Sequence, residues 1–375
     1  MKIAYFIGTF KKEDGVAQVL LAIIREARKK GIESVIVTGW AEDVSVSPVP
    51  VIQVPSIIFP LYKEYRLPLP GMGGFEGRLN EFQPDIIHIH SPDTIAFAAL
   101  KYAKKYNLPV FATHHTDFAR YLSYYRISFL KPLLWFILRR LYARINIVTV
   151  PSPVTANDLT SHGIKNVAVI QWGVDFTRFN PSFRSEAWRE KIAGSKEKNI
   201  LLCVCRLTWE KDLRTLAAIF HLLKKNRSDF VMVIAGDGPI SKELKLLMPE
   251  AVFLGHIEGY ELSQAYASSD ILLFPSSTET FGNVTIEAMA SGIIPIVADA
   301  GGSKSLVKNG ETGFLAEPKN PDDFYKKTVM LLDDLKLREK MKTAGAGFVK
   351  NFAWENVFDA LLKIYADFPR KTREV

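Results

Sequence analysis

Short apolar runs alternate with longer amphipathic segments from the first residues along most of the sequence, and this alternation restricts the possible folds. Short apolar runs bounded by turn residues predict buried strands, and apolar residues at helical spacing predict the helices that cover them. Because these runs are continuous rather than alternating, they favour parallel sheets covered on both faces. The sequence therefore predicts an α/β protein made of doubly wound units.

The alternation occurs in two series separated by a polar stretch. The first series predicts strands at Lys2–Ile7, Ser34–Thr38, Asp85–His90, Pro109–Thr113 and Ile145–Val150, with helices at Val16–Lys30, Thr94–Lys105 and Ser152–His162. The second predicts strands at Asn199–Cys205, Phe230–Ala235, Ile271–Phe274 and Ile294–Ala298, with helices at Asp212–Lys225 and Asn283–Ser291. The polar residues from Trp172 to Lys198 are interpreted as a linker, and the chain after Pro321 as mostly helical. Ligands of such sheets bind beyond the carboxyl ends of the strands, so two facing units would enclose a cleft.

Composition narrows the class of protein. The chain has 375 residues, 48% of them hydrophobic and 23% charged, which suits a globular protein of two domains. No uncharged apolar stretch reaches the roughly 18 residues of a membrane-spanning helix. The charged run from Lys11 to Asp14 follows the apolar N-terminus at once, which argues against a signal peptide. Cys203 and Cys205 are expected to be small core residues in a reducing cytosol.

One segment departs from the alternation by its charge. Between Phe118 and Asn157 there is no acidic residue, but there are six basic and eight aromatic residues. Such a segment is able to lie on an anionic membrane surface, and the alternative is a core helix with a solvated basic face. The apolar run Pro132–Leu138 argues against nucleic acid as the partner. The residues predicted to contact a membrane are Arg120, Arg126, Lys131, Trp135, Phe136, Arg139 and Arg140.

The most informative motif lies after the predicted strand Ile271–Phe274. A turn containing Gly282 leads into a helix that begins near Asn283, so the first N–H groups of that helix would form a phosphate site. Glu279 precedes this helix and Glu287 lies about one turn inside it. Two carboxylates around a helix N-terminus suit a sugar nucleotide, with Glu287 bonded to ribose hydroxyls and Glu279 to the sugar. Either carboxylate alone would be interpreted as a solvated surface charge.

A diphosphate also needs positive charge. Arg206 and Lys211 follow the strand Asn199–Cys205 and are able to neutralise a pyrophosphate without a metal ion. No Asp-x-Asp sequence occurs anywhere in the chain, so the carboxylate pair that usually binds a metal–diphosphate is missing. The turn Gly236–Pro239 brings backbone close either to other backbone or to a ligand.

The first series carries histidines at the ends of its strands. His114 and His115 follow the strand Pro109–Thr113, where a histidine is able to donate to a sugar or transfer a proton. His88 and His90 share one face of their strand. A zinc site is one alternative for these four residues, and core hydrogen bonds are the favoured one. Gly15, after the first strand, would let backbone approach a substrate. No Gly-x-Gly-x-x-Gly follows that strand and no Walker A motif occurs, which argues against nicotinamide oxidoreductases and P-loop ATPases.

Taken in order along the chain, these motifs resemble those of the retaining glycosyltransferases of family 4, which have the GT-B fold of two Rossmann-like domains. The motifs that carry the resemblance are Asp14-Gly15-Val16, Thr113 to Phe118, Val150-Pro151-Ser152, Gly173-Val174-Asp175, Arg178-Phe179, Arg206-Leu207, Glu210-Lys211, Gly236 to Pro239, Phe274-Pro275-Ser276, Glu279 to Val284, Glu287 to Ala290, Gly301-Gly302 and Gly310 to Gly313. The family's paired glutamates correspond to Glu279 and Glu287. Within the family the chain is most similar to enzymes that glycosylate lipids: mannosyl-, glucosyl- and sulfoquinovosyltransferases.

The resemblance implies roles for individual residues. The residues it places in catalysis are His115, Glu279, Arg206 and Lys211. The residues it places around the donor are Gly15, Arg206, Lys211, Gly236, Glu279, Phe281, Gly282, Asn283, Val284, Thr285 and Glu287. The acceptor hydroxyl would attack from the side of the leaving group, whose phosphate oxygen would take its proton, so the anomeric configuration would be retained. Two departures affect the donor loops, because Asp14 and Cys205 stand where the family usually has glycine.

The resemblance also implies the organisation of the protein. We expect an acceptor-binding domain at 1–173 with the helix 354–375 packed back on it, and a nucleotide-sugar-binding domain at 174–353. The expected reaction is hexose transfer from a UDP- or GDP-sugar to a lipid at the inner face of the cell membrane, with no cofactor, metal ion or nucleic acid. The alternatives are a glycosyltransferase with a soluble sugar acceptor, a sugar-nucleotide epimerase or hydrolase on the same fold, and a non-catalytic binding protein.

Overall fold

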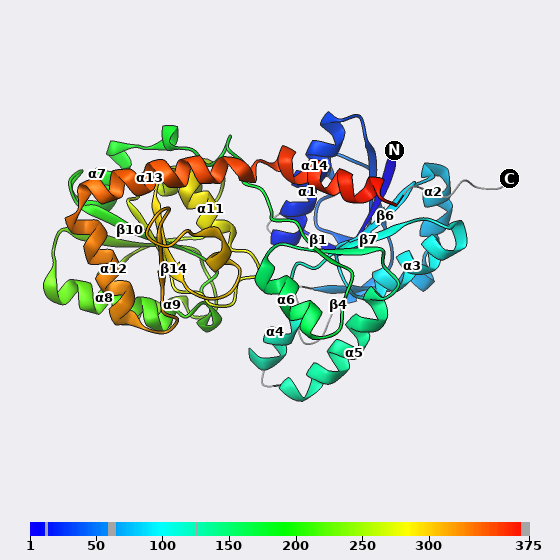
Figure 1. Cartoon of the computed structure of the whole chain (residues 1–375), viewed down its shortest axis with the longest axis horizontal. Helices are drawn as coiled ribbons and strands as arrows, with labels where there is room; N and C mark the ends of the chain where they lie inside the picture. The colour runs from blue at the N-terminus through cyan, green and yellow to red at the C-terminus, as the bar shows by residue number, and fades with distance from the viewer. Residues whose placement is uncertain (12–13, 59–64, 125–126, 369–375) are drawn as a thin grey trace. The chain divides into compact units, whose positions relative to one another are not determined.

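The computed structural model describes residues 1–11, 14–58, 65–124 and 127–368 and divides into two compact units (Figure 1). Unit 1 comprises Met1–Trp172 together with Trp354–Val375, and unit 2 comprises Gly173–Ala353. The expected boundary differs from this division only in the assignment of Gly173. None of the described helices is long and apolar enough to cross a membrane.

Unit 1 is built on a parallel sheet of seven strands in the order β3-β2-β1-β6-β7-β8-β9. The strands are β1 (Lys2–Phe10), β2 (Glu33–Ala41), β3 (Val51–Gln53), β6 (Ile86–Ile89), β7 (Val110–Thr113), β8 (Ile147–Val150) and β9 (Val167–Val169). β1 is almost wholly buried, because it lies inside the sheet with helices on both faces. An antiparallel hairpin of β4 (Ser56–Ile58) and β5 (Arg66–Pro68) stands outside this sheet.

Helices cover the sheet of unit 1. They are α1 (Gly15–Lys29), α2 (Phe75–Phe82), α3 (Thr94–Tyr106), α4 (Phe118–Tyr124), α5 (Lys131–Tyr142), α6 (Pro153–Ser161) and α14 (Trp354–Ala366). α14 lies beside α1, although the two are at opposite ends of the sequence (Figure 1). The Lys30 ammonium and the Asp359 carboxylate, 2.8 Å apart, join the two helices. The C-terminal helix therefore packs back on unit 1, as the resemblance implied.

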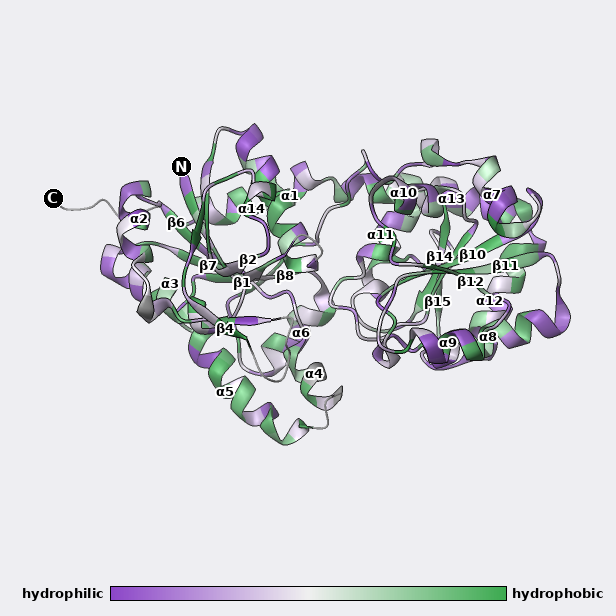
Figure 2. Ribbon diagram, turned by 180° about the vertical axis from the view of Figure 1, so that it is seen from behind, coloured by the Kyte–Doolittle hydropathy of each residue, from purple (hydrophilic) through white to green (hydrophobic). Residues whose placement is uncertain are grey.

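Unit 2 repeats the architecture with six parallel strands in the order β12-β11-β10-β13-β14-β15. The strands are β10 (Asn199–Val204), β11 (Phe230–Ala235), β12 (Val252–Gly255), β13 (Ile271–Phe274), β14 (Ile294–Ala298) and β15 (Phe314–Ala316). Its helices are α7 (Glu186–Ala193), α8 (Leu213–Asn226), α9 (Ser241–Leu247), α10 (Gly259–Ala267), α11 (Asn283–Ala290), α12 (Pro321–Asp333) and α13 (Leu335–Val349). Figure 2 shows hydrophobic strands inside and hydrophilic segments on α8 and α9 outside. The prediction of two doubly wound α/β units is confirmed.

The interpretation of residues 172–198 as a linker is wrong. The segment contains α7, and it packs on unit 2 through the buried Arg189. The Arg189 guanidinium donates to the Asp270 carboxylate at 2.9 Å and to the Ser268 carbonyl at 2.7 Å. Arg338 Nη2 lies 3.0 Å from the other oxygen of Asp270. The segment is therefore anchored to unit 2 by the buried Arg189, although most of its other polar residues are exposed.

In each sheet, the side on which successive strands are added reverses at one place. Successive strands of unit 1 are added on one side of β1 up to β3 and then on the other side from β6, so the switch lies between β1 and β6. In unit 2 the same switch lies between β10 and β13. The loops at the carboxyl ends of strands next to such a switch diverge, which leaves room for a ligand there. These two places are where candidate site residues are expected.

Candidate functional site

The N-terminus of α11 follows β13 at the switch of unit 2. Gly282 precedes the helix with a φ of 100°, and no side chain caps it. A Cβ on Gly282 would lie 2.1 Å from Ser303 Oγ, so both the backbone angle and the available space require glycine here. The first turn of α11 therefore has N–H groups that no side-chain cap satisfies, an arrangement that suits an anion.

Three buried polar atoms gather around this N-terminus. Asn283 Oδ1, Thr285 Oγ1 and Ser303 Oγ have no hydrogen-bond partner among the described residues. Buried polar atoms are normally bonded, so three such atoms next to one helix end mark a place where a polar ligand is accommodated. Thr285 is the residue that the resemblance expected to add a hydroxyl to the diphosphate.

Lys211 and Glu279 form a direct ion pair beside this helix end. Lys211 Nζ lies 2.7 Å from Glu279 Oε1, and Ser276 Oγ donates to the same oxygen at 2.7 Å. Lys211 ends the short 3₁₀ turn Trp209–Lys211 after β10, and Glu279 follows β13. The switch between these neighbouring strands thus brings together two residues that are 68 positions apart.

The loops that carry this pair are tied to each other by close backbone packing. Thr278 Oγ1 donates to the Glu210 carbonyl at 3.2 Å, which joins the loop after β13 to the loop after β10. A Cβ on Gly236 would lie 1.9 Å from the Cys205 carbonyl oxygen. The structure therefore accounts for Gly236 by its approach to backbone, and a donor contact by Gly236 stays a prediction.

Glu287 lies on α11, facing Tyr266 of α10. The Tyr266 hydroxyl donates to Glu287 Oε2 at 2.8 Å. Burial raises the pKa of the Glu287 carboxyl, while the bond from Tyr266 and the positive charge of Arg178 oppose that shift. The bond from Tyr266 fixes the orientation of this carboxylate, and a ribose contact by Glu287 stays a prediction. Tyr266 is not predicted as a site residue from the sequence, since an aromatic residue on a helix has the pattern of a core residue.

The remaining donor residues of unit 2 differ in exposure. Arg206 follows β10 and its side chain is exposed, whereas Val284 is half-buried in the first turn of α11. The Phe281 side chain is buried and lies against Phe352, with ring centroids 6.4 Å apart. Phe281 is therefore able to offer a ligand its backbone but not its ring.

In unit 1, His115 follows β7 and is held between two rings. His115 Nε2 lies 2.8 Å from Nδ1 of His90, which follows β6. The ring centroids of His115 and Trp172 are 5.3 Å apart. Burial lowers the pKa of His115 well below its usual value and that of His90 to about 3, so both imidazoles are neutral. His115 is thus a fixed, uncharged hydrogen-bonding group.

The other strand-end histidines satisfy hydrogen bonds in the core. His88 is bonded to the Tyr365 hydroxyl at 2.5 Å and to Thr113 Oγ1 at 2.8 Å. His114 is bonded to the Tyr142 hydroxyl at 2.8 Å. This is the favoured alternative of the sequence analysis. Within the described ranges, no group of three or more histidines, cysteines or carboxylates is arranged to hold a metal ion.

Gly15 begins α1 beyond the carboxyl end of β1. A Cβ there would meet no atom within 4 Å, so space is open beside its backbone. Asp14 caps the helix, because its carboxylate accepts a hydrogen bond from the Val16 N–H at 2.8 Å. An acidic residue at this position is therefore explained by helix capping.

The predicted membrane residues do not all lie on the surface. Trp135 is 7% exposed, and its ring stacks on His162 of unit 1 with centroids 3.7 Å apart. Its assignment to a membrane surface is wrong, because it belongs to the face of α5 that packs on the sheet. Phe136, Arg139 and Arg140 of the same helix are exposed, and Lys131 is half-buried. Arg126 and the side chain of Arg120 lie outside the described part of the structure.

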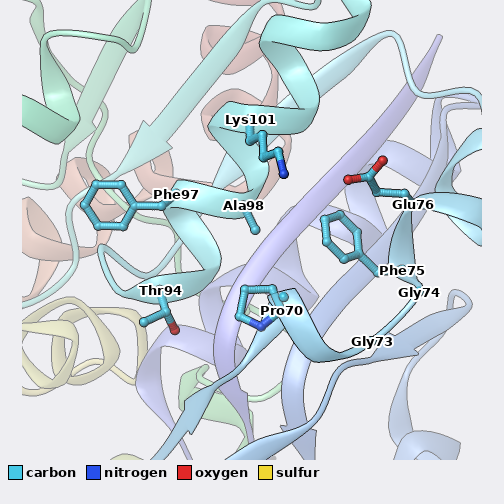
Figure 3. A pocket seen from close by; sticks show the side chains of 10 residues that line it. Pro70, Gly73, Gly74, Phe75, Glu76, Thr94, Phe97, Ala98 and Lys101 are labelled. Carbon is cyan, nitrogen blue, oxygen red and sulfur yellow. The ribbon is translucent and has the colours of Figure 1, made fainter.

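Unit 1 also contains a pocket of about 620 Å³ between α2 and α3 (Figure 3). Phe75, Glu76, Thr94, Phe97 and Lys101 are among its lining residues. None of the residues that the sequence analysis singled out lines it. The pocket is therefore separate from the strand-end site.

Comparisons with known proteins agree with this geometry. Residues 14–178 match the family described as Glycosyltransferase Family 4, and residues 184–373 match the family described as Glycosyl transferases group 1. A sulfoquinovosyl transferase of Arabidopsis thaliana is 34% identical over 94% of this chain and 71% of its own length. A GDP-mannose-dependent alpha-mannosyltransferase of Corynebacterium glutamicum is 31% identical over 98% of this chain and 89% of its own length.

Solved structures show the same fold at lower sequence identity. Anabaena HepE in complex with UDP and glucose has a TM-score of 0.78 and 17% identity, covering 98% of this chain and all of that one. A sucrose-phosphate synthase of Thermosynechococcus elongatus has a TM-score of 0.79 and 19% identity, with 98% of each chain covered. From these matches and from the two doubly wound units, the chain belongs to the family 4, group 1 glycosyltransferases of GT-B fold and is a glycosyltransferase.

Proposed function

We propose that this glycosyltransferase moves a hexose from a UDP- or GDP-sugar to a lipid acceptor at an anionic membrane surface, with retention of configuration. The observation that carries the donor half of the proposal is the Lys211–Glu279 pair beside the uncapped N-terminus of α11. A cation, a carboxylate and free N–H groups at one strand switch are the groups that a sugar diphosphate needs.

Each end of the donor has a suitable partner in unit 2. The diphosphate would accept hydrogen bonds from the backbone of residues 281–285 and from Thr285 Oγ1, with Arg206 and Lys211 balancing its charge. The ribose would bond to the carboxylate of Glu287, which Tyr266 orients. The transferred sugar would bond to the carboxylate of Glu279, which Lys211 and Ser276 hold in place.

The proposed chemistry uses the leaving group itself as the base. The acceptor hydroxyl forms the new glycosidic bond on the face that the diphosphate leaves, and the departing phosphate oxygen takes the hydroxyl proton. Arg206, Lys211 and the N–H groups of α11 would stabilise the negative charge that develops on the diphosphate. We therefore propose that the charge on the leaving group is balanced by side chains and backbone, with no metal ion. Gly15 would leave room for the donor beside unit 1, and His115 would bond near the reacting carbon.

Two observations support a lipid acceptor at a membrane. The first is that relatives carry such names: besides the sulfoquinovosyl transferase, an alpha-monoglucosyldiacylglycerol synthase of Streptococcus pneumoniae is 26% identical over 80% of this chain. The second is the outer face of α5, where Leu133, Phe136 and Ile137 are exposed beside Arg139 and Arg140. Figure 2 shows hydrophobic and hydrophilic segments side by side on this helix. Apolar and basic side chains on one helix face suit the inner, anionic leaflet of a cell membrane.

The test is nucleotide release from a panel of UDP- and GDP-sugars, with and without anionic vesicles that carry diacylglycerol or phosphatidylinositol. We expect release to require the vesicles and labelled sugar to appear in the lipid. Release without any acceptor would favour a sugar-nucleotide hydrolase or epimerase. Transfer to an added soluble sugar in the absence of vesicles would replace the lipid by a soluble acceptor.

A further inference from the structure

The segment Gly301-Gly302-Ser303, which follows β14, lies directly on the loop that carries Glu279. The Gly302 N–H donates to the Glu279 carbonyl at 2.6 Å. A Cβ on Gly302 would lie 2.3 Å from the Thr280 carbonyl oxygen, and a Cβ on Gly301 would lie 2.9 Å from the Glu279 carbonyl oxygen. The two glycines therefore let this backbone approach the Glu279 loop closely, and Ser303 is the first residue of the segment that has a side chain.

The Ser303 side chain is directed at the N-terminus of α11. Its Oγ lies 2.1 Å from the position that a Cβ on Gly282, the residue before this helix, would take. Ser303 is fully buried, and its Oγ has no hydrogen-bond partner in the part of the chain that the structure describes. Because water bonds to this hydroxyl in the unfolded chain, leaving it unpaired lowers the stability of the folded chain.

A second serine shows that an unpaired hydroxyl alone does not identify a ligand. Ser291 follows the C-terminus of α11, and its Oγ is also buried without a partner among the described residues. Carbonyl groups gather at that end of the helix and disfavour an anion. Ser303 differs because it lies at the opposite end, where no side chain caps the N–H groups of the first turn.

A phosphate suits both the helix end and the Ser303 hydroxyl. Backbone N–H groups and a serine hydroxyl donate, whereas the oxygens of an ionised phosphate accept, so the chemistry fixes the direction of each hydrogen bond. Rotation about the Cα–Cβ bond of Ser303 turns its hydroxyl from the buried position toward a bound ligand without moving the backbone. The hydroxyl would then gain the partner that it lacks in the ligand-free chain.

The neighbours of Ser303 indicate which phosphate it would contact. Its segment is bonded to the loop of Glu279, the residue proposed to hold the transferred sugar. Glu287, proposed for the ribose, lies farther along α11 and is bonded to Tyr266 of α10 instead. The phosphate on the sugar side of the diphosphate is therefore the one that Ser303 would meet.

We propose that Ser303 belongs to the donor site and that its hydroxyl donates a hydrogen bond to the phosphate that bears the transferred sugar. The inference rests on the proposed function, which assigns the diphosphate to this helix end. When the bond between the sugar carbon and the phosphate oxygen breaks, negative charge grows on this phosphate, so the contact strengthens as the leaving group departs. A serine after two glycines has the pattern of an ordinary turn residue, so the sequence does not predict it as part of the site.

The first test compares thermal unfolding and nucleotide binding in Ser303→Ala. Removing an unpaired buried hydroxyl should leave the unfolding temperature of the ligand-free chain unchanged or raise it. In calorimetry, the affinity for UDP or GDP, whichever binds the unsubstituted chain more tightly, should fall about 5- to 30-fold. The affinity for the matching monophosphate, UMP or GMP, should change by less than about twofold. An unchanged diphosphate affinity, or an equal loss for the monophosphate, would overturn the proposal.

Ser291→Ala is the matched control, because it removes an equally buried and unpaired hydroxyl from the other end of α11. Its unfolding temperature should respond as that of Ser303→Ala does, but its diphosphate affinity should not change. Ser303→Cys, in which a weak S–H donor replaces the hydroxyl, should bind with an affinity between those of Ser303→Ala and the unsubstituted chain. Equal losses of affinity in Ser291→Ala and Ser303→Ala would assign the effect to packing of the helix and overturn the proposal.

Kinetics with the donor identified by the release panel provide a further readout. We expect Ser303→Ala to lower kcat about 10-fold or more, since the lost contact is strongest when the diphosphate leaves. An unchanged kcat in Ser303→Ala would contradict a contact that strengthens during transfer. If neither UDP nor GDP binds the unsubstituted chain, the proposed function itself fails. If one of them binds the unsubstituted chain and Ser303→Ala equally well, only the role of Ser303 fails.

Discussion

Lys211 and Glu279 share a contact of 2.7 Å between the ammonium nitrogen and Oε1 of the carboxylate, and Ser276 binds the same oxygen. Both side chains are mostly shielded from solvent, so their positions are well defined relative to the N-terminus of α11. The pair holds a cation and a carboxylate beside the helix end. This arrangement leads to the first prediction.

The variant Lys211→Ala should lose the cation that balances the donor diphosphate. We expect kcat/KM to fall about 100- to 1000-fold, because a charge-assisted contact that strengthens on the leaving group is removed. UDP or GDP should also bind more weakly in calorimetry. Lys242→Ala, at an exposed lysine of α9, is the control. Unchanged nucleotide affinity and kcat/KM in Lys211→Ala would contradict the assignment.

The variant Tyr266→Phe should release Glu287 from its hydrogen bond. A lost bond to a carboxylate corresponds to about 1–2 kcal/mol, so nucleotide affinity should fall about 5- to 30-fold. Glu287→Ala should lose nucleotide binding more fully. The specific readout is discrimination between a nucleotide and its 2′,3′-dideoxy analogue, which should diminish in both variants. Equal discrimination in Glu287→Ala and the unsubstituted chain would exclude a ribose contact.

The variant Asp270→Asn should destabilise unit 2. Asp270 is buried between the guanidinium groups of Arg189 and Arg338 and accepts from the Ile200 N–H at 2.8 Å. Removing its charge leaves two buried cations without their partner, which costs about 3–5 kcal/mol. Urea denaturation measures the loss. The exposed pair of Arg227 and Asp229 provides the control, since Asp229→Asn should cost no more than about 1 kcal/mol.

Buried histidines should make unit 1 sensitive to acid. Burial lowers the pKa of His114 to about 4 and that of His90 to about 3, so the unfolded chain binds protons that the folded chain does not. Their contribution to stability is complete above about pH 6.5 and is lost as pH falls toward 4. The Asp93 carboxyl, whose pKa burial raises to about 6, opposes this trend between about pH 4 and 6. The two histidines outweigh the effect of Asp93, because they are more numerous and each of their pKa values is shifted further.

We therefore expect the free energy of unfolding to decrease between pH 7 and pH 5. The variant His114→Gln should flatten this dependence by roughly 2 kcal/mol. His221→Gln, at an exposed histidine of α8, should leave it unchanged. A stability that rises on acidification over this range would show that the Asp93 carboxyl dominates instead.

We predict that the outer face of α5 binds anionic membranes. Phe136→Glu combined with Leu133→Glu replaces two exposed apolar side chains by acidic ones, so binding to anionic vesicles should fall at least about tenfold. Turnover of a water-soluble acceptor analogue should not change. Leu246→Glu is the matched control, because Leu246 is still more exposed but lies on α9 of unit 2. An equal loss of vesicle binding in the α5 variant and in Leu246→Glu would contradict a specific role of α5 in membrane binding.

Several elements were not predictable from local pattern. β9 and β15 have only three residues each and are edge strands of their sheets, so they lack the long apolar run that identifies a buried strand. Trp135 fits a membrane-facing position by composition, but α5 turns it inward onto His162. The polar residues around Arg189 resemble a linker, and only the contact of Arg189 with Asp270, 81 positions away, shows that the segment belongs to unit 2.

The two α/β series and the family follow from local sequence patterns, as do the strand-end residues that we propose for a sugar diphosphate. These are local properties: apolar runs, a glycine before a helix, and charged residues directly after strands. Which of these residues contact one another depends on the arrangement of the strands in space. Strand order places the loops after β10 and β13 side by side, so that Lys211 contacts Glu279, and it places His90 within hydrogen-bonding distance of His115. These contacts join residues that are far apart in the chain, so they are a property of packing rather than of local sequence.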